Sequence, residues 1–85
     1  MINNQNNSWV YMWVYYLEDK PAFLQSGQFR TFNLVFTFTE DNPQTTIMVV
    51  CDDMGKTTST SFIVNAESPP VINAYYNSDG TITIL

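Results

Sequence analysis

A regular alternation of apolar and polar side chains runs through residues 29–40. One parity carries Phe32, Leu34, Phe36 and Phe38, and the other carries Thr31, Asn33, Thr37 and Thr39, with Val35 as the only apolar interruption. Because successive side chains of a β-strand point to opposite faces, the pattern predicts a strand with one apolar face. A helix would scatter the same apolar residues around its circumference. We expect the rest of the chain to cover this apolar face, so the fold is organised around this strand.

Residues 9–17 predict a second strand, and its apolar side chains fall on both parities. The aromatic parity consists of Trp9, Tyr11, Trp13 and Tyr15, and the opposite parity begins with Val10, Met12 and Val14. Such a strand lies between two layers or places one face in an oligomer contact. A helix is the alternative interpretation. The preceding residues 1–8 are polar and Asn-rich, which indicates a flexible arm or a tail that orders against a neighbour.

Turn signals divide the remaining chain into short strands. Residues 18–21 and 41–44 predict turns, and residues 22–28 predict a loop or a short edge strand. The further strands are expected at residues 45–51, 57–65, 71–76 and 81–85, with loops at 52–56 and 77–80. The pattern therefore predicts six to seven strands without a significant helix. We expect a flexible arm over residues 1–8 and one small antiparallel β-sandwich domain over residues 9–85.

The predicted hairpin at residues 47–64 resembles the last hairpin of immunoglobulin-like and PKD-like β-sandwich domains. In both, an apolar strand ends in Asp-x-x-Gly, here Asp52 to Gly55, and returns through a Thr/Ser-rich strand. The resemblance covers about a fifth of the chain. The chain departs from it because residues 71–85 add a further hairpin, and because Cys51 has no second cysteine. The resemblance implies a scaffold for adhesion or assembly rather than a reaction.

Charge narrows the range of partners. Eight acidic residues face three basic ones, and the bases Lys20, Arg30 and Lys56 are far apart in the sequence. No basic patch is therefore expected, which argues against direct binding of nucleic acid or of an anionic membrane surface. The longest apolar run has nine residues, and a membrane-spanning helix needs about 20. With a lone cysteine and no signal-peptide pattern, we expect synthesis and folding in the cytosol.

Candidate catalytic groups are scarce. The chain has no His, and its one cysteine, Cys51, ends an apolar strand, where a thiol is typically an inert small apolar group. No base stands at a recognisable spacing from a serine, so we expect a protein that is not an enzyme and has no cofactor. Asp52 and Asp53 are the candidate ligands for Ca²⁺, although ordinary turn chemistry also places aspartates there.

Aromatic content is the remaining clue to function. Aromatic residues make up 15% of the chain, and the candidate interface residues are Trp9, Tyr11, Trp13, Tyr15, Tyr75 and Tyr76. We expect a non-enzymatic interaction module that meets a protein partner or forms a homo-oligomer, such as a capsid decoration or tail accessory subunit of a virion or phage. One alternative is a carbohydrate-binding or adhesion module. Another is a small acidic inhibitor of a basic or nucleic-acid-binding protein.

Overall fold

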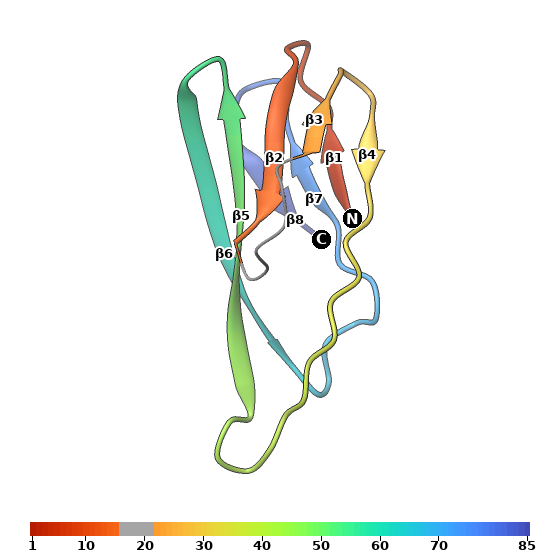
Figure 1. Cartoon of the computed structure of the whole chain (residues 1–85), viewed down its shortest axis with the longest axis vertical. Coiled ribbons are helices and arrows are strands. Elements are labelled where there is room, and N and C mark those ends of the chain that lie inside the picture. The colour runs from red at the N-terminus through yellow and green to blue at the C-terminus, as the bar shows by residue number, and fades with distance from the viewer. Residues whose placement is uncertain (16–21) are drawn as a thin grey trace.

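The computed structural model describes residues 1–15 and 22–85 as two four-stranded β-sheets packed face to face (Figure 1). The strands are β1 (Ile2–Asn4), β2 (Val10–Val14), β3 (Ala22–Leu24), β4 (Phe29–Arg30), β5 (Gln44–Asp53), β6 (Lys56–Asn65), β7 (Ala74–Tyr76) and β8 (Ile82–Ile84). The predicted all-β sandwich is confirmed, with eight strands instead of six to seven and no helix in the described part of the chain. The predicted turn at residues 18–21, and the end of the strand predicted at 9–17, lie outside the described residues.

Sheet B has the order β3-β2-β5-β6 and is built on the long β5–β6 hairpin. Ten residue pairs run without interruption from Gln44↔Asn65 to Asp53↔Lys56. Met54 (φ 52°) and Gly55 (φ 90°) form the turn, and both take the left-handed backbone that a two-residue hairpin loop favours. The hairpin predicted from Asp-x-x-Gly is confirmed. Since residues 10–14 form strand β2 and pair with β5, the helical alternative is wrong for this part of the chain.

Sheet A has the order β4-β1-β7-β8 and contains the last predicted hairpin, β7–β8. Its inner strand β1 runs antiparallel to β4 and parallel to β7, with Ile2 opposite both Arg30 and Ala74. The flexible arm expected at residues 1–8 is therefore corrected, because residues 2–4 lie in the middle of a sheet. Ile2 is buried among apolar side chains, and the equally buried Asn4 has hydrogen-bond partners for its amide, so a polar segment can occupy this position.

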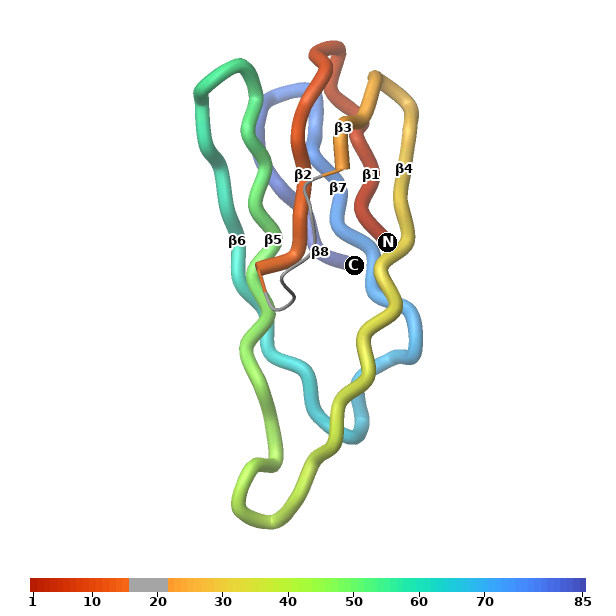
Figure 2. Tube along the Cα trace, viewed as in Figure 1, coloured from red at the N-terminus to blue at the C-terminus, as the bar shows by residue number. Residues whose placement is uncertain are grey.

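The strand predicted over residues 29–40 is the largest difference between sequence and structure. Only Phe29–Arg30 forms a strand, and it pairs with β1. The last pair of this ladder is Ile2 with Arg30, so the residues after Arg30 have no partner strand in sheet A. Residues 31–39 continue outside any strand, although their alternation persists: Phe32, Leu34, Phe36 and Phe38 are half-buried and the residues between them are exposed. Their sidedness was predicted correctly, but they flank the core instead of forming its centre (Figure 2).

The core lies between the sheets in the half of the molecule where both are present. Sheet B contributes Val10, Met12, Val14, Ile47, Val49, Cys51 and Val64, and sheet A contributes Ile2, Ala74 and Tyr76. These are the inward parities of their strands, so the period of two decides which side chains are buried. The aromatic parity of β2 is left on the outer face of sheet B.

Candidate interaction surface

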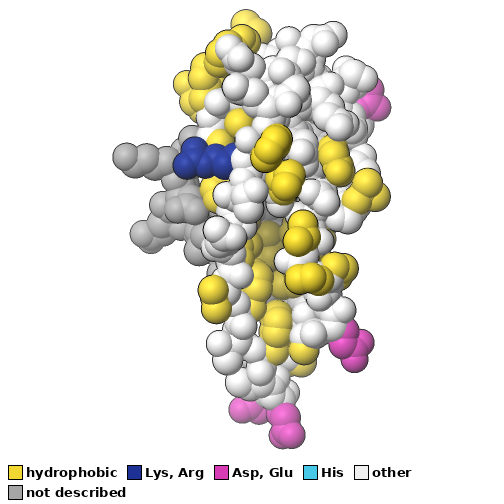
Figure 3. Space-filling model, turned by 90° about the vertical axis from the view of Figure 1, so that its right-hand side faces the viewer, with side chains coloured by type: hydrophobic (Ala, Val, Ile, Leu, Met, Phe, Trp, Pro, Cys, Tyr) yellow, Lys and Arg dark blue, Asp and Glu magenta, His cyan; other side chains and the backbone are white. Residues whose placement is uncertain are grey.

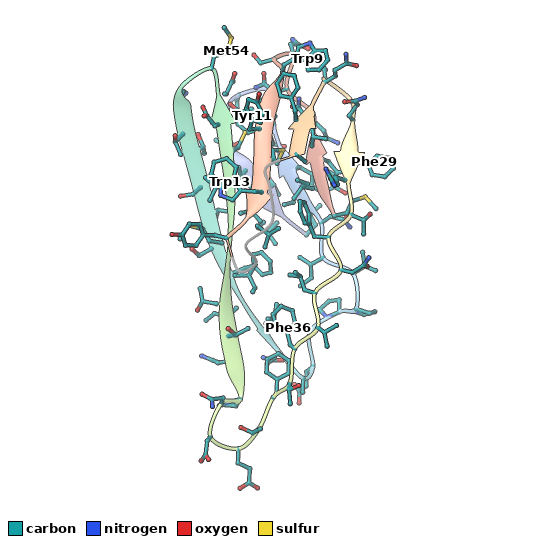
Figure 4. All side chains as sticks on the ribbon, in the orientation of Figure 1. Trp9, Tyr11, Trp13, Phe29, Phe36 and Met54 are labelled. Atoms are coloured by element: carbon teal, nitrogen blue, oxygen red, sulfur yellow. The ribbon has the colours of Figure 1, made fainter. Side chains whose placement is uncertain are left out.

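Three aromatic rings gather on the outer face of sheet B and form the aromatic cluster, defined as Trp9, Tyr11 and Phe23. Figure 4 labels two of them, Trp9 and Tyr11. The register of β2 and β3 sets Tyr11 directly opposite Phe23. The Phe23 ring centroid is 4.6 Å from that of Tyr11 and 4.7 Å from that of Trp9. About half of each side chain remains exposed: 47% of Trp9, 47% of Tyr11 and 50% of Phe23. The cluster is thus a preformed apolar projection whose rings are held by one another.

A shallow hollow borders the cluster at the end of the β5–β6 hairpin. Besides the three rings it is lined by Asn7, Ser8, Asp52, Met54 and Gly55. The Met54 residue is 91% exposed at the tip of the turn, so it adds an unbranched apolar side chain beside the rings. Among these lining residues Asp52 alone is charged, which gives this surface an apolar centre and an acidic margin.

The aromatic side chains predicted on β2 differ in how far they are exposed. Tyr15 is 70% exposed, and its backbone N–H donates to the Met48 carbonyl at 2.8 Å. Trp13 is half-buried and stands directly opposite Val50, which is buried although its parity faces outward. Trp9, Tyr11 and Trp13 therefore share the outer face of sheet B, and Tyr15, directly after β2, is exposed.

The two predicted tyrosines of β7 do not join this surface. Tyr75 lies on the outer face of sheet A, opposite Thr83 and Asn3. Tyr76 is only 1% exposed, so its place among the interface residues is corrected to the core. Tyr76 pairs with Ile82, whose side chain faces the core, so the Tyr76 side chain faces the core as well. The sequence has two adjacent tyrosines here, and the alternation alone does not show which of them faces inward.

Phe23 and Met54 also belong to this surface, although the alternation of apolar and polar residues did not predict them. Phe23 lies in a three-residue strand, Ala22–Leu24, whose flanking residues are buried while Phe23 is exposed. The apolar run was visible in the sequence, but its pairing with β2 depends on sheet formation. Met54 stands in the hairpin loop, where exposure could have been inferred from the turn alone.

The carboxylates of Asp52 and Asp53 are both occupied by hydrogen bonds. Asp52 Oδ1 accepts from the Gly55 N–H at 2.9 Å and shapes the turn. Asp53 Oδ2 accepts from the Tyr76 hydroxyl at 2.8 Å and joins β5 to β7. No group of three or more His, Cys, Asp or Glu able to hold a metal ion occurs among residues 1–15 and 22–85. Asp52 therefore stabilises the turn, and Asp53 bonds to a core tyrosine.

Cys51 is fully buried between the sheets and points away from solvent. Burial, followed by the negative charges of Asp53 and Asp52, raises the pKa of its thiol to about 12. The thiol is therefore protonated at neutral pH, and a protonated thiol is a poor nucleophile and a poor metal ligand. The position explains Cys51 as a small apolar core residue.

A second, larger hollow of about 650 Å³ opens between the lower half of sheet B and residues 31–38. Its wall is largely apolar and includes Phe32, Leu34, Phe36, Phe62 and Ile72. Figure 3 shows apolar side chains gathered over this face, with acidic side chains at its lower end. No Asp, Glu, Lys, Arg, His or Cys is among the described residues that line it. The lining does include Met1, whose α-amino group donates to the Ile72 carbonyl at 2.7 Å and has its pKa lowered by burial.

The acidic residues that the structure describes do not form a continuous stripe. Asp41 precedes β5 and Asp53 ends it, so these two acidic sites are separated by a ten-residue strand. An acidic mimic of nucleic acid needs closely spaced charges along one surface. The separation gives that interpretation no structural support.

No family model, no curated protein and no solved structure matches the chain. Within the described residues, no helix has the length and apolar character needed to cross a membrane.

Proposed function

We propose that this domain is a non-enzymatic interaction module that binds another protein through the aromatic cluster of sheet B. The observation that carries the proposal is the set of three rings, in which Trp9 stacks on Phe23 and Tyr11 packs against Phe23 at an angle, while each residue stays about half exposed. Trp and Tyr are enriched at the centres of protein interfaces because they supply large contact areas with few rotatable bonds. Rings already fixed by their neighbours lose little further freedom on binding.

The surface also defines the chemistry of the partner. Its centre is apolar and its margin carries Asp52, while the whole chain has a net charge of −5. A partner with an apolar pocket and a basic margin would complement both features. In its most concrete form, the module is a subunit of a larger assembly, such as a capsid decoration or tail accessory protein of a virion or phage. That form rests on elimination and on analogy with β-sandwich scaffolds, which the resemblance of residues 47–64 also suggests.

The ring geometry favours a protein partner over a sugar. Carbohydrate platforms stack a sugar ring on the exposed face of an aromatic ring. Here the Trp9 and Tyr11 rings lie against the Phe23 ring at centroid distances of 4.7 Å and 4.6 Å, with interplanar angles of 30° and 31°. The three rings therefore do not form one flat platform, and such an angled surface suits a shaped protein pocket better than a flat sugar ring.

Site-directed photocrosslinking in the native source tests the proposal. A photoreactive phenylalanine analogue is placed at Tyr11 or Phe23, and at Phe29 as the control. Phe29 is 62% exposed and lies on the outer face of sheet A, so it matches Phe23 in chemistry but not in location. We expect one discrete crosslinked protein from Tyr11 and Phe23 and none from Phe29. Equal crosslinking at all three positions would contradict the proposal.

Fluorescence separates the sugar-binding alternative, because both tryptophans of the chain, Trp9 and Trp13, are on β2 or directly before it. The purified domain is titrated with a panel of neutral and acidic oligosaccharides. A protein-binding module should show no saturable change in emission. Saturable quenching that a Trp9→Ser variant abolishes would replace the proposal with carbohydrate binding.

A further inference from the structure

The longest free edge of the molecule is β6. In the described part of the chain, β6 pairs along one side with β5 and forms the outer margin of sheet B (Figure 1). It has ten residues, whereas the other edge strands β3, β4 and β8 have three, two and three. Short edge strands are one way in which proteins avoid pairing with another chain. The edge at β6 lacks that protection.

The hairpin turn establishes which backbone groups of β6 point outward. Since the two-residue turn closes on the pair Asp53↔Lys56, that pair is hydrogen-bonded, and bonded and non-bonded pairs alternate along an antiparallel ladder. The even-numbered residues of β6 therefore bond to β5. The N–H and C=O groups that face the free edge belong to Thr57, Ser59, Ser61 and Ile63.

Asn65 supports this assignment independently because it has the same parity. Its N–H donates to Ser68 Oγ at 2.9 Å, and its carbonyl accepts from the Ser68 N–H at 3.1 Å. Both of its backbone groups are thus turned away from β5 and are used by the following loop. The loop ends the free edge at Ile63, and the turn ends it at Lys56.

The edge also lacks the other protective devices. Residues 57–65 contain neither proline nor a charged residue. The unbroken register of ten pairs leaves no β-bulge in the strand. Thr57, Ser59, Ser61 and Ile63 are all exposed. A long, regular, uncharged edge is a template for another strand.

We propose that β6 pairs antiparallel with β6 of a second copy of this chain, across a two-fold axis at Thr60, and joins two B sheets into one. In this register Thr57 pairs with Ile63 of the second copy, and Ser59 pairs with Ser61 of the second copy. Every outward N–H and C=O of the edge then has a partner. A shift of the axis by one residue in either direction leaves some of these groups unpaired, so hydrogen bonding selects the register.

The side chains suit self-pairing as well as the backbone does. Thr60 faces Thr60 of the second copy, and threonine pairs across strands are favourable. Lys56 faces Val64, so no like charges stand opposite each other along the joined edge. A second copy supplies the matching length and pattern without any further requirement, whereas a different protein would need its own uncharged extended segment. The edge is therefore assigned to self-association.

This dimer goes beyond the proposed function and uses a different surface. A two-fold axis perpendicular to the joined sheet keeps both outer faces on the same side. Both aromatic clusters would then face one direction, which makes the dimer a bivalent form of the module. Bivalent attachment raises the effective affinity for a repetitive target surface without new contacts.

Sedimentation equilibrium of the full chain with two charge variants tests the register. In S59K/S61E, each new lysine faces a new glutamate of the second copy, so the dimer should be retained or strengthened. In S59K/S61K, lysines face lysines, and the dimer dissociation constant should rise at least tenfold. Circular dichroism confirms that both variants keep the fold. A monomeric wild-type chain at about 0.5 mM would overturn the proposal, and so would equal behaviour of the two variants.

Amide hydrogen exchange provides a readout residue by residue. The amides of Thr57, Ser59, Ser61 and Ile63 should become protected as protein concentration rises, while those of Thr58 and Thr60 are protected throughout. The variant Y11S removes part of the aromatic cluster and should leave the dimer unchanged. If Y11S abolishes the dimer and S59K/S61K does not, the interface lies on the aromatic face and the inference about β6 is wrong. Failure of the crosslinking experiment would leave this result unaffected.

Discussion

The Tyr76 hydroxyl donates a 2.8 Å hydrogen bond to Asp53 Oδ2 and thereby ties β7 of sheet A to the end of β5 in sheet B. The Tyr76 ring is buried in the core, and its hydroxyl reaches the Asp53 carboxylate at the end of β5. A buried phenol whose hydroxyl is satisfied stabilises the packing, and one that loses its partner does not.

Removal of that hydroxyl should weaken the fold. We expect Tyr76→Phe to lower the free energy of unfolding by about 1.5–3 kcal/mol, the range for hydrogen bonds to charged groups. The matched control is Tyr75→Phe on the outer face of sheet A, with an expected change of about 0.5 kcal/mol or less. Urea unfolding followed by circular dichroism measures both. Equal losses would mean that the hydroxyl of Tyr76 contributes nothing specific.

Stability should fall at alkaline pH. Burial raises the pKa of the Cys51 thiol from 9.0 to about 12, and burial together with the Asp53 hydrogen bond raises the pKa of Tyr76 above its ordinary 10.0. Because these groups stay protonated longer in the folded chain, their contribution is complete below about pH 9. It decreases as pH rises from there toward the folded-state pKa values. Each group adds a slope of up to about 1.4 kcal/mol per pH unit.

Urea unfolding between about pH 8 and pH 11 checks this window. The double variant Cys51→Ala, Tyr76→Phe should show a smaller decrease in stability over the same range, whatever its stability at neutral pH. An unchanged slope would show that other groups account for the alkaline loss.

Asn4 should be among the most sensitive polar positions. Its Nδ2 donates to the Leu24 carbonyl at 3.0 Å and to the Ser8 carbonyl at 2.8 Å, and its Oδ1 accepts from the Asn6 N–H at 3.0 Å. We expect Asn4→Ala to cost about 2–3 kcal/mol, because it leaves these backbone groups without their partner. Thermal unfolding compares it with Asn7→Ala, an exposed asparagine three residues away that should change little. A mild effect at Asn4 would indicate that water replaces its amide.

Phe36 tests the sidedness of residues 31–39. Because Phe36 is half-buried, we expect Phe36→Ala to cost about 1–3 kcal/mol, below the range for a fully buried phenylalanine. Thr37→Ala, on the exposed parity, should cost about 0.5 kcal/mol or less. Chemical denaturation of both variants supplies the comparison. A larger loss at Thr37 would reverse the assignment of the two faces.

Features that depend on neighbouring residues were predictable. The turn at Met54 and Gly55 follows from local backbone preferences, and it placed the β5–β6 hairpin correctly. The alternation in residues 10–14 separated Val10, Met12 and Val14 from the aromatic parity, and the structure buries that apolar set. Most of the aromatic surface could therefore be anticipated from period two alone.

Features that depend on distant pairing were not predictable. Ile2 stands opposite Ala74 in a parallel pair, and nothing in residues 1–8 indicates a partner so far along the chain. Pairing with a distant segment also determined the structure of residues 29–40. Their alternation predicts a long strand, but only the two residues that pair with β1 form one. Phe23 joined the aromatic cluster because β3 pairs with β2, a contact between segments separated in sequence.

The order of residues by itself determined two properties: the β character of the chain and the side of each strand that is apolar, because both arise from adjacent residues and a fixed period. Only the tertiary structure decided which strands became inner or edge strands, which of two neighbouring tyrosines entered the core, and which rings met on the surface. Those outcomes depend on hydrogen bonds and contacts between segments far apart, and no local pattern encodes which segments will meet.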